Sequence, residues 1–340
     1  MKAAIAGYSQ SGKKTLFTLL TGRKLHAAAK PGEAVEGRAA VRDPRVDRIA
    51  GIVRPAKTTY AETVLQLCPD AGEGASRDWV DPARRCDLVC FLVRAFSDGS
   101  VYHPKGSVDP VRDRRELQAE LLLADLEMVE TRLDRMSKEK RAGLTSSQKA
   151  EEHVLTRCKS ALEDEKPASA LNLDSHEVAS VRSLGLLTLK PVLWILNVDE
   201  DDLAEKGDEI RISCRIEEEI AEMDGAEERR EYLSALGLKE PGIDRFNARA
   251  YDALGYMSFY TMGEDEVRAW TIRKGALAPE AAGRIHSDIE RGFIRAEVIK
   301  YDDLIALGSE KAVREHGKVM LKGKDYAIQD GDICSFLFNV

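Results

Sequence analysis

Residues 7–15 read Gly-Tyr-Ser-Gln-Ser-Gly-Lys-Lys-Thr and follow a short apolar run at residues 1–6. They lead into residues 15–20, which have a helix-like pattern, so the order is strand, glycine-rich loop and helix. The phosphate-loop pattern G-x-x-x-x-G-K-[ST] requires this setting. Its two glycines let the backbone bend until successive N–H groups point inward and, with a helix N-terminus, form an anion-binding nest. The alternative is a glycine-rich turn before an ordinary helix.

The residues of this loop that we expect to bind phosphate are Gly7, Gln10, Ser11, Gly12, Lys13, Lys14 and Thr15. Lys13 would reach the β- and γ-phosphates of a nucleoside triphosphate. The next position of the pattern is a Ser or Thr whose hydroxyl binds Mg²⁺, and Lys14 stands there. The loop therefore predicts phosphate binding and argues against metal-assisted hydrolysis.

The composition is that of a globular protein with two or three domains: 340 residues, 43% hydrophobic and 32% charged. A net charge of −8 argues against a surface that coats nucleic acid, but it allows a local basic patch. No apolar run approaches the roughly 20 residues that span a bilayer. Six cysteines without C-x-x-C spacing predict buried free thiols. We expect a cytoplasmic protein with no membrane partner.

The first two thirds of the chain have the pattern of an α/β sheet domain. Residues 24–42 are rich in Ala, Gly and Lys and predict a connection. Asp43 and Pro44 then predict the start of a helix. Short apolar runs at residues 63–68, 87–96, 191–197 and 209–213 predict strands. Apolar strands separated by helices indicate a parallel sheet that is covered on both faces.

Between the predicted strands at 87–96 and 191–197 the pattern becomes that of a coiled coil. Apolar residues recur at spacings of three and four over residues 119–136, Gly143 interrupts the pattern, and a second stripe follows at 154–162. We predict an antiparallel helical hairpin inserted into the α/β domain. Its tip carries the cations Lys138, Lys140 and Arg141. Such a run is either a solvated face or a contact surface for RNA, and the sequence leaves both open.

The last 80 residues or so predict a small α+β module. Short β-like runs alternate with helical patterns at 279–289 and 302–307, and a tight turn at 330–332 precedes a final strand at 333–339. The expected domains are a nucleotide-binding domain at 1–110 and 186–255, a helical insertion at 111–185 and a C-terminal domain at 256–340.

A base-reading loop is expected at residues 197–200, directly after the apolar strand. GTPases have N-K-x-D at this place, where the carboxylate accepts two hydrogen bonds from guanine. Val198 and Glu200 replace the Lys and Asp, so guanine selection is not supported. The predicted base-binding residues are Asn197, Val198, Glu200, Ser213 and Cys214, the last two resembling the S-A-K loop of GTPases. Alone, either motif is as typical of a helix cap.

Over essentially its whole length the chain resembles the YchF (Obg-like ATPase) family of the translation-factor GTPase class. The resemblance lies in residues 41–55, 119–132, 197–200 and, above all, 258–339. It implies a GTPase-like α/β domain, an inserted coiled-coil arm and a C-terminal TGS domain of the β-grasp type. It also implies binding of ATP or GTP, with ATP preferred, and association with ribosomes or RNA.

The departures from the family pattern concern Mg²⁺. By alignment with the family, Lys14 replaces the metal-binding hydroxyl, Ala34 the switch threonine and Pro69 the D-x-x-G aspartate; Gln10 and Glu73 differ as well. Asp70 comes one residue late and remains the one candidate metal ligand, although on a strand its side chain would point to the opposite face. Three changes at one ion favour loss of the metal function.

Three functions remain open from the sequence. The first is a nucleotide-binding protein with little or no hydrolysis, whose nucleotide state is coupled to a ribosome or RNA. The second is an interaction scaffold that needs no nucleotide. The third is an active ATPase with an unusual metal arrangement.

Overall fold

The computed structural model describes all residues except 26–32, 73–76, 140–142, 144, 204–208 and 340. The chain forms two compact units. The first comprises Met1–Ala39 and Val64–Arg245, and the second comprises Ala40–Thr63 and Phe246–Val340.

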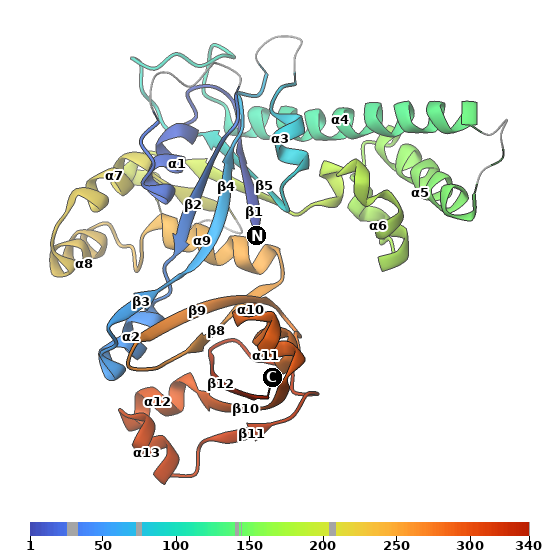
Figure 1. The fold of residues 1–340 in the computed structure, drawn as a ribbon. Helices are drawn as coiled ribbons and strands as arrows, with labels where there is room; N and C mark the ends of the chain where they lie inside the picture. Colours follow the sequence, from blue (N-terminus) through green and yellow to red (C-terminus); the bar gives the residue numbers. More distant parts are fainter. Residues whose placement is uncertain (26–32, 73–76, 140–142, 144, 204–208, 340) are drawn as a thin grey trace. The chain divides into compact units, whose positions relative to one another are not determined.

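The first unit is built on a sheet of order β2-β4-β1-β5-β6-β7 (Figure 1). The strands are β1 Lys2–Ala6, β2 Val35–Val41, β4 Ala61–Leu67, β5 Leu88–Arg94, β6 Val192–Asn197 and β7 Ile210–Ile212. The pairs β1–β4, β1–β5, β5–β6 and β6–β7 are parallel. Every residue of β5 is buried, as its continuous apolar sequence requires in a sheet covered on both faces. The predicted α/β fold is confirmed.

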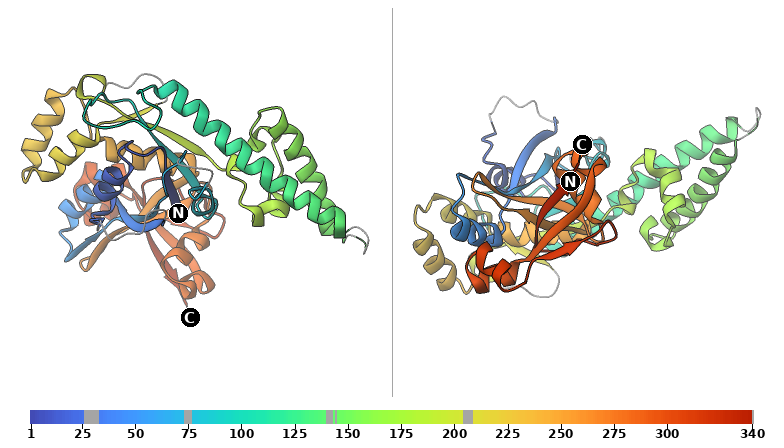
Figure 2. Two further views of the ribbon diagram at one scale, coloured as in Figure 1. Left: turned by 90° about the horizontal axis from the view of Figure 1, so that it is seen from above. Right: turned by 60° about the horizontal axis from the view of Figure 1, so that its bottom comes forward.

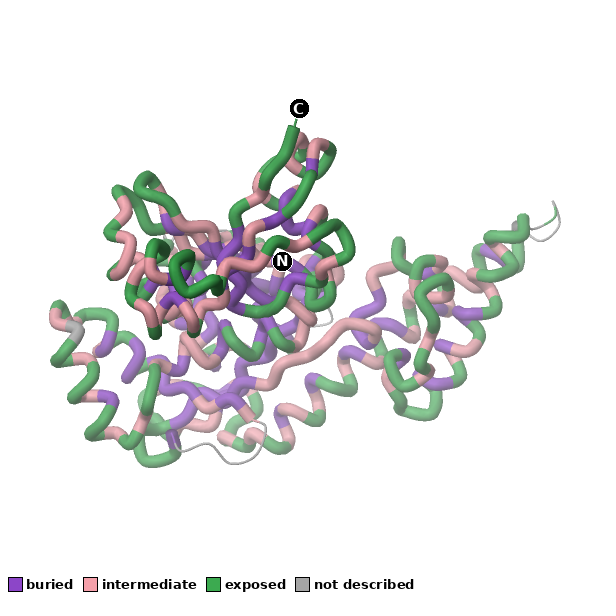
Figure 3. The backbone as a smooth tube through the Cα atoms, turned by 90° about the horizontal axis from the view of Figure 1, so that it is seen from below, coloured by how far each residue is buried: buried purple, intermediate pink, exposed green. Residues whose placement is uncertain are grey.

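The helices of this unit follow the strands in the alternating order that parallel strands need. They are α1 Lys13–Thr21, α3 Val80–Arg84, α4 Pro110–Glu139, α5 Ser146–Glu163, α6 Ser175–Val181, α7 Cys214–Glu222 and α8 Ala226–Ala235. The described residues of this unit also form the short 3₁₀ helices η2 Ala168–Leu171, η3 Arg182–Leu184, η4 Leu187–Leu189 and η5 Glu200–Asp202. One core joins side chains of β1, β5 and β6 to those of α3, α4 and α7. Figure 3 shows buried residues alternating with exposed ones along the helical turns of the chain.

The connection predicted over residues 24–42 is wrong for residues 35–41, which form β2. Alternate residues of this strand face inward, but they include Gly37 and Ala39 rather than large apolar side chains. A Cβ at Gly37 would lie within 2.8 Å of side-chain atoms of Phe17 and Thr21 on α1. Small residues are needed where this strand meets the helix, and they conceal the two-residue period in the sequence.

The helical hairpin is confirmed: α4 and α5 lie side by side and run in opposite directions (Figures 1 and 2). Its seam buries Val129 and Met136 of α4 against Val154 and Cys158 of α5. Thr145 begins α5 with a capping box, in which its hydroxyl accepts a hydrogen bond from the backbone N–H of Gln148.

Asp125 of α4 fixes the base of the hairpin. Its carboxylate is fully buried and accepts hydrogen bonds from the N–H groups of Leu187 and Thr188, at 3.0 and 2.7 Å, and from the Thr188 hydroxyl. Arg84 of α3 lies 2.7 Å away and neutralises the charge. A buried carboxylate is tolerated only with such a full set of partners.

The second unit contains a mixed sheet of order β11-β10-β12-β8-β9-β3. Its strands are β3 Lys57–Thr59, β8 Tyr256–Thr261, β9 Glu266–Arg273, β10 Phe293–Lys300, β11 Met320–Lys322 and β12 Asp332–Phe338. Its helices are α2 Pro44–Val53, α9 Gly242–Ala253, which begins before the boundary, α10 Ala278–Ile285, α11 Ser287–Arg291, α12 Tyr301–Leu307 and α13 Glu310–Glu315. The segment 40–63 belongs to this unit because β3 pairs in parallel with β9.

The helix predicted to begin at Asp43 and Pro44 is α2, and Asp43 caps it by accepting a hydrogen bond from the Arg45 N–H at 3.0 Å. The single helix predicted over 279–289 is instead the two short helices α10 and α11. His286 between them is extended, and its ring nitrogen accepts the N–H of Asp288 to cap α11.

All six cysteines are buried and unpaired, which confirms the expected buried thiols. In the part of the chain that the structure describes, no helix has both the length and the apolarity that crossing a membrane requires.

Candidate nucleotide-binding site

The loop between β1 and α1 has the backbone of an anion nest. Gly7, Gln10 and Gly12 all have positive φ, at 145°, 58° and 96°. A Cβ at Gly7 would lie 2.3 Å from the carbonyl oxygen of Leu92, so no other residue fits there. These positions fold the loop back over the end of β1, which directs backbone N–H groups into its concave side.

The N-terminus of α1 lacks the usual caps. Its N-cap is Gly12, which has no side chain to accept an orphan N–H, and its first turn contains no acidic residue. Lys13 and Lys14 stand instead at the positive end of the helix dipole, where cations are unfavourable. A bound anion would stabilise this arrangement, which is the reverse of what a helix without a ligand would favour.

Lys13 reaches across the loop. Its ammonium donates to the carbonyl oxygens of Gly7 at 2.8 Å and Tyr8 at 2.7 Å and lies 2.5 Å from a carboxylate oxygen of Asp70. The Lys13 side chain is only 3% exposed, whereas that of Asp70 is 28% exposed. Burial lowers the pKa of Lys13, and the Asp70 carboxylate opposes that change.

Asn197 at the end of β6 joins the phosphate loop to the start of α7. Its amide donates to the Ser11 carbonyl at 3.0 Å, and its oxygen accepts from the Cys214 N–H at 3.0 Å. A Cβ at Gly12 would lie 2.4 Å from the Asn197 amide nitrogen. The structure thus brings Asn197, Ser213 and Cys214 beside the phosphate loop.

The remaining predicted base-binding residues are not gathered there. Val198 is 3% exposed and belongs to the hydrophobic core of the first unit. Glu200 is exposed and begins η5. Val198 therefore contributes to packing in this structure, and no lysine takes the place beside a base that the GTPase pattern provides.

The residues present do not fit a Mg²⁺ ion of the usual kind. Lys14 is exposed and offers an ammonium in place of a hydroxyl, Pro69 has no side-chain donor and Ala34 has none either. Asp70 lies against Lys13, and Glu73 lies outside the described residues. In the described part of the chain no group of three or more His, Cys, Asp or Glu residues is placed to hold a metal ion. Mg²⁺ requires near-octahedral oxygen ligands.

Sequence reasoning missed the role of Tyr8. Its hydroxyl donates to Glu116 of α4 at 2.8 Å, and Lys105 pairs with the same carboxylate. Burial first, and then the hydrogen bond to Glu116, raises the pKa of the tyrosine. Arg77 also contacts α4, through Glu120 at 2.7 Å. The phosphate loop and the segment after Asp70 are therefore both tied to the arm helix. The only hint of this role in the sequence was the presence of an aromatic residue, Tyr8, inside a glycine-rich loop.

The arm tip is described only in part. Lys138 is exposed, while Lys140 and Arg141 lie outside the described residues. Arg132, further back on α4, pairs with Glu151 of α5 at 2.7 Å.

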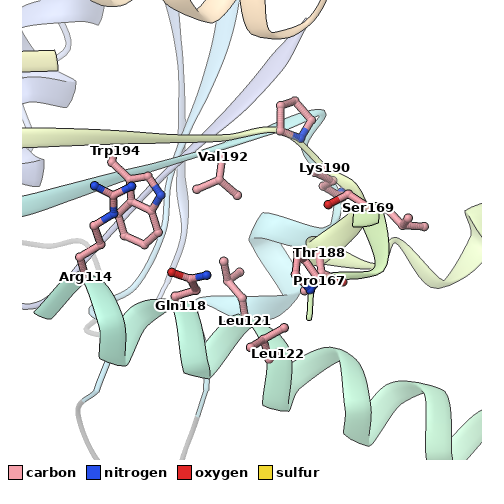
Figure 4. A pocket seen from close by; sticks show the side chains of 12 residues that line it. Arg114, Gln118, Leu121, Leu122, Pro167, Ser169, Thr188, Lys190, Val192 and Trp194 are labelled. Carbon is pink, nitrogen blue, oxygen red and sulfur yellow. The ribbon is translucent and has the colours of Figure 1, made fainter. Parts of the chain in front are cut away.

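A separate hollow of about 400 Å³ lies at the base of the arm between α4 and β6 (Figure 4). Trp194 and Arg114 lie at one end, with the guanidinium over the ring at 5.1 Å, and Leu121 and Val192 line the middle. No residue that the sequence predicted for nucleotide binding lines this hollow.

The nest, the buried lysine and the asparagine that joins the two loops define a phosphate-loop nucleotide-binding protein. A family model described as "YchF-GTPase_C: Protein of unknown function (DUF933)" matches residues 256–339. The chain is 39% identical to a ribosome-binding ATPase YchF of Bacillus subtilis, with both chains covered completely. It is 34% identical to Obg-like ATPase 1 of Caenorhabditis elegans, over all of this chain and 92% of the relative. The chain belongs to the YchF family.

The fold agrees with this assignment. The structure of the Schizosaccharomyces pombe YchF GTPase matches with a TM-score of 0.82 and 31% identity, over 99% of this chain and 97% of that one. The resemblance that the sequence suggested is therefore confirmed.

Proposed function

We propose that this chain binds a purine nucleotide, ATP in preference to GTP, hydrolyses it slowly or not at all, and couples its nucleotide state to association with a ribosome or RNA. The observation that carries the proposal is a complete phosphate nest beside altered metal positions. Gly7, Gly12 and Lys13 keep the cradle, while Lys14 and Pro69 stand where Mg²⁺ ligands are expected.

Impaired hydrolysis follows from the chemistry of phosphoryl transfer. The protein contributes mainly positioning and charge stabilisation, and Mg²⁺ supplies much of the latter. Loss of Mg²⁺ raises the activation free energy by several kcal/mol, and each increase of about 1.36 kcal/mol lowers the rate tenfold. We therefore expect turnover at least about a hundredfold below that of the Bacillus subtilis relative in the same assay. Lys14 would restore charge balance for binding, but an ammonium cannot bridge phosphate oxygens as the ion does.

The preference for ATP rests on the base loop. Asn197 is positioned by Ser11 and Cys214, but Val198 is buried and cannot stack on a base as a lysine would. With glutamate at position 200 in place of the guanine-reading aspartate, the loop offers no selection for guanine, and the family resemblance implies a preference for ATP with this Asn-x-x-Glu sequence. Titration calorimetry with ATP, GTP and ADP, with and without Mg²⁺, tests this part. Tight Mg²⁺-dependent binding with rapid turnover would instead support an active ATPase.

The ribosome part rests on the names of the relatives, which are ribosome-binding ATPases, and on the cationic arm tip. Such a function implies a cytoplasmic protein. Reversing Lys138, Lys140 and Arg141 to Glu should reduce co-sedimentation with ribosomes, most strongly at low salt. The matched control reverses Arg85, Arg230 and Lys239, three exposed cations outside the arm, with the same change in net charge. Equal co-sedimentation of both triple variants would remove the arm tip from the proposal.

A second candidate function is a scaffold that binds its partner without nucleotide. The ion pair between Lys13 and Asp70 favours it, because the residue that should bind phosphate already has a carboxylate partner. Calorimetry decides between the two: absence of heat with every nucleotide, together with retained co-sedimentation, would establish the scaffold.

A further inference from the structure

Lys13 has no donor to spare. An ammonium group has three N–H donors, and its three acceptors in this structure are the carbonyl oxygens of Gly7 and Tyr8 and one carboxylate oxygen of Asp70. With 3% of the side chain exposed, water does not compete for these bonds. A phosphate oxygen can therefore bind Lys13 only after one of the three acceptors has left.

The two carbonyls are held by the backbone. The Gly7 oxygen also accepts the Ala71 N–H at 3.0 Å, and Tyr8 and Ala71 form a parallel bridge. Gly7 itself is packed against the Leu92 carbonyl, too closely for a Cβ. Neither carbonyl can move away from Lys13 unless the backbone at the end of β1 moves with it.

Asp70 is different because it contributes only a side chain. It is 28% exposed on one side of the lysine, and rotation about its own bonds can release it while the neighbouring Ala71 stays paired to Gly7. It is also an anion, so it repels the phosphate that approaches Lys13. Both arguments make Asp70 the acceptor that phosphate displaces.

We propose that Asp70 is a built-in competitor that determines the affinity of the nucleotide site: it takes the place of a phosphate oxygen on Lys13, and a nucleotide binds by displacing it. The proposal rests on the proposed nucleotide binding and adds the residue that sets its strength. It also accounts for Asp70 at a position where a metal ligand was sought, because the carboxylate serves the lysine.

The test is calorimetry with ATP and ADP in the presence of EDTA, on the full chain and on D70N and D70A. Removing a charged competitor should tighten binding of both nucleotides by about tenfold to a hundredfold. The control D81N removes the same charge from an exposed residue at the start of α3 and should leave the affinity unchanged. In the K13M background the substitution D70N should give no gain in nucleotide affinity, so K13M/D70N should bind no more tightly than K13M, because the competition acts through Lys13.

The outcomes separate the two proposals. If neither the natural chain nor the Asp70 variants bind ATP or ADP, nucleotide binding fails and the competitor fails with it. If the natural chain binds and both Asp70 variants bind equally or more weakly, the competitor is overturned while nucleotide binding stands. If both variants lose their circular-dichroism spectrum, the competitor is overturned too, because a side chain that a ligand displaces cannot be one that the fold requires.

Discussion

Replacing Asn197 by alanine tests whether one side chain holds the phosphate loop and α7 together. The substitution removes two buried hydrogen bonds of 3.0 Å, one to the Ser11 carbonyl and one from the Cys214 N–H. Each such bond contributes about 1 kcal/mol net, and a buried group left without a partner costs about 1–3 kcal/mol. We expect the opening free energy of the loop and α1 to fall by about 2–4 kcal/mol.

Hydrogen exchange measured by mass spectrometry on peptides covering residues 7–21 reads this opening directly, separately from the second unit. Amides whose exchange follows the opening equilibrium should exchange roughly 30-fold to several hundredfold faster, since about 1.36 kcal/mol corresponds to a factor of ten. ATP binding should weaken at least about tenfold in the same variant, because the carbonyl of Ser11 loses the donor that orients it.

Two matched variants interpret the result. Asn197→Asp keeps an acceptor for Cys214 but loses the donor to Ser11, so it should loosen the loop more than it loosens α7. Asn247→Ala removes a buried asparagine from the second unit and should leave residues 7–21 unchanged. Unchanged exchange of residues 7–21 in Asn197→Ala would refute the reasoning, because the loop would then be held by other contacts.

Three further predictions concern other parts of the chain. Asp125→Ala leaves Arg84 buried without its partner and should lower the free energy of unfolding of the first unit by about 3–5 kcal/mol, seen as a lower urea midpoint; an unchanged midpoint would contradict the role given to this carboxylate. Burial opposes ionisation of Asp43, but its hydrogen-bond donors outweigh burial and lower its pKa. The folded state then binds fewer protons at Asp43 than the unfolded state does. This stabilisation of the second unit is therefore present above the usual aspartate range and is lost as the pH falls through the lowered pKa. Acid titration of Trp270 fluorescence should show this loss of stability in the natural chain and not in Asp43→Asn. Gly7→Ala, with a Cβ 2.3 Å from the Leu92 carbonyl and φ of 145°, should abolish ATP binding in calorimetry, whereas Gly51→Ala on exposed α2, where a Cβ meets nothing within 4 Å, should not.

The parts of the fold that the sequence predicted are those where one strong local signal agrees with burial. The strands β5 and β6 come from continuous apolar runs, and α2 begins at Asp43 because an N-cap and a proline at the first position act together. The arm is readable because its seam repeats over many turns. Each of these signals depends on residues close in sequence.

What the sequence could not supply depends on residues far apart. The strand β2 contains Gly37, where a larger residue would collide with Phe17 and Thr21 of α1. This contact exists only in the folded chain, so the sequence alone does not reveal why a glycine stands in the strand. Tyr8 is paired with Glu116, more than a hundred residues later. The helical pattern of the sequence continues through His286, but in the structure this residue is extended and caps the second of two short helices.

Asp70 shows how a correct local rule fails for a long-range reason. A shift of one residue along a strand turns a side chain to the opposite face, and this argued against Asp70 as a substitute for the carboxylate missing at Pro69. The strand β4, however, ends at Leu67, so the rule no longer applies three residues later. Residue 70 is free to approach the phosphate loop, and the pairing of Ala71 with Gly7 keeps it there. The carboxylate thus reaches the phosphate loop from the neighbouring position and pairs with the Lys13 ammonium. With proline at position 69 and aspartate at position 70, the carboxylate next to the phosphate loop is a partner of Lys13, and the proposed competition with phosphate depends on this contact.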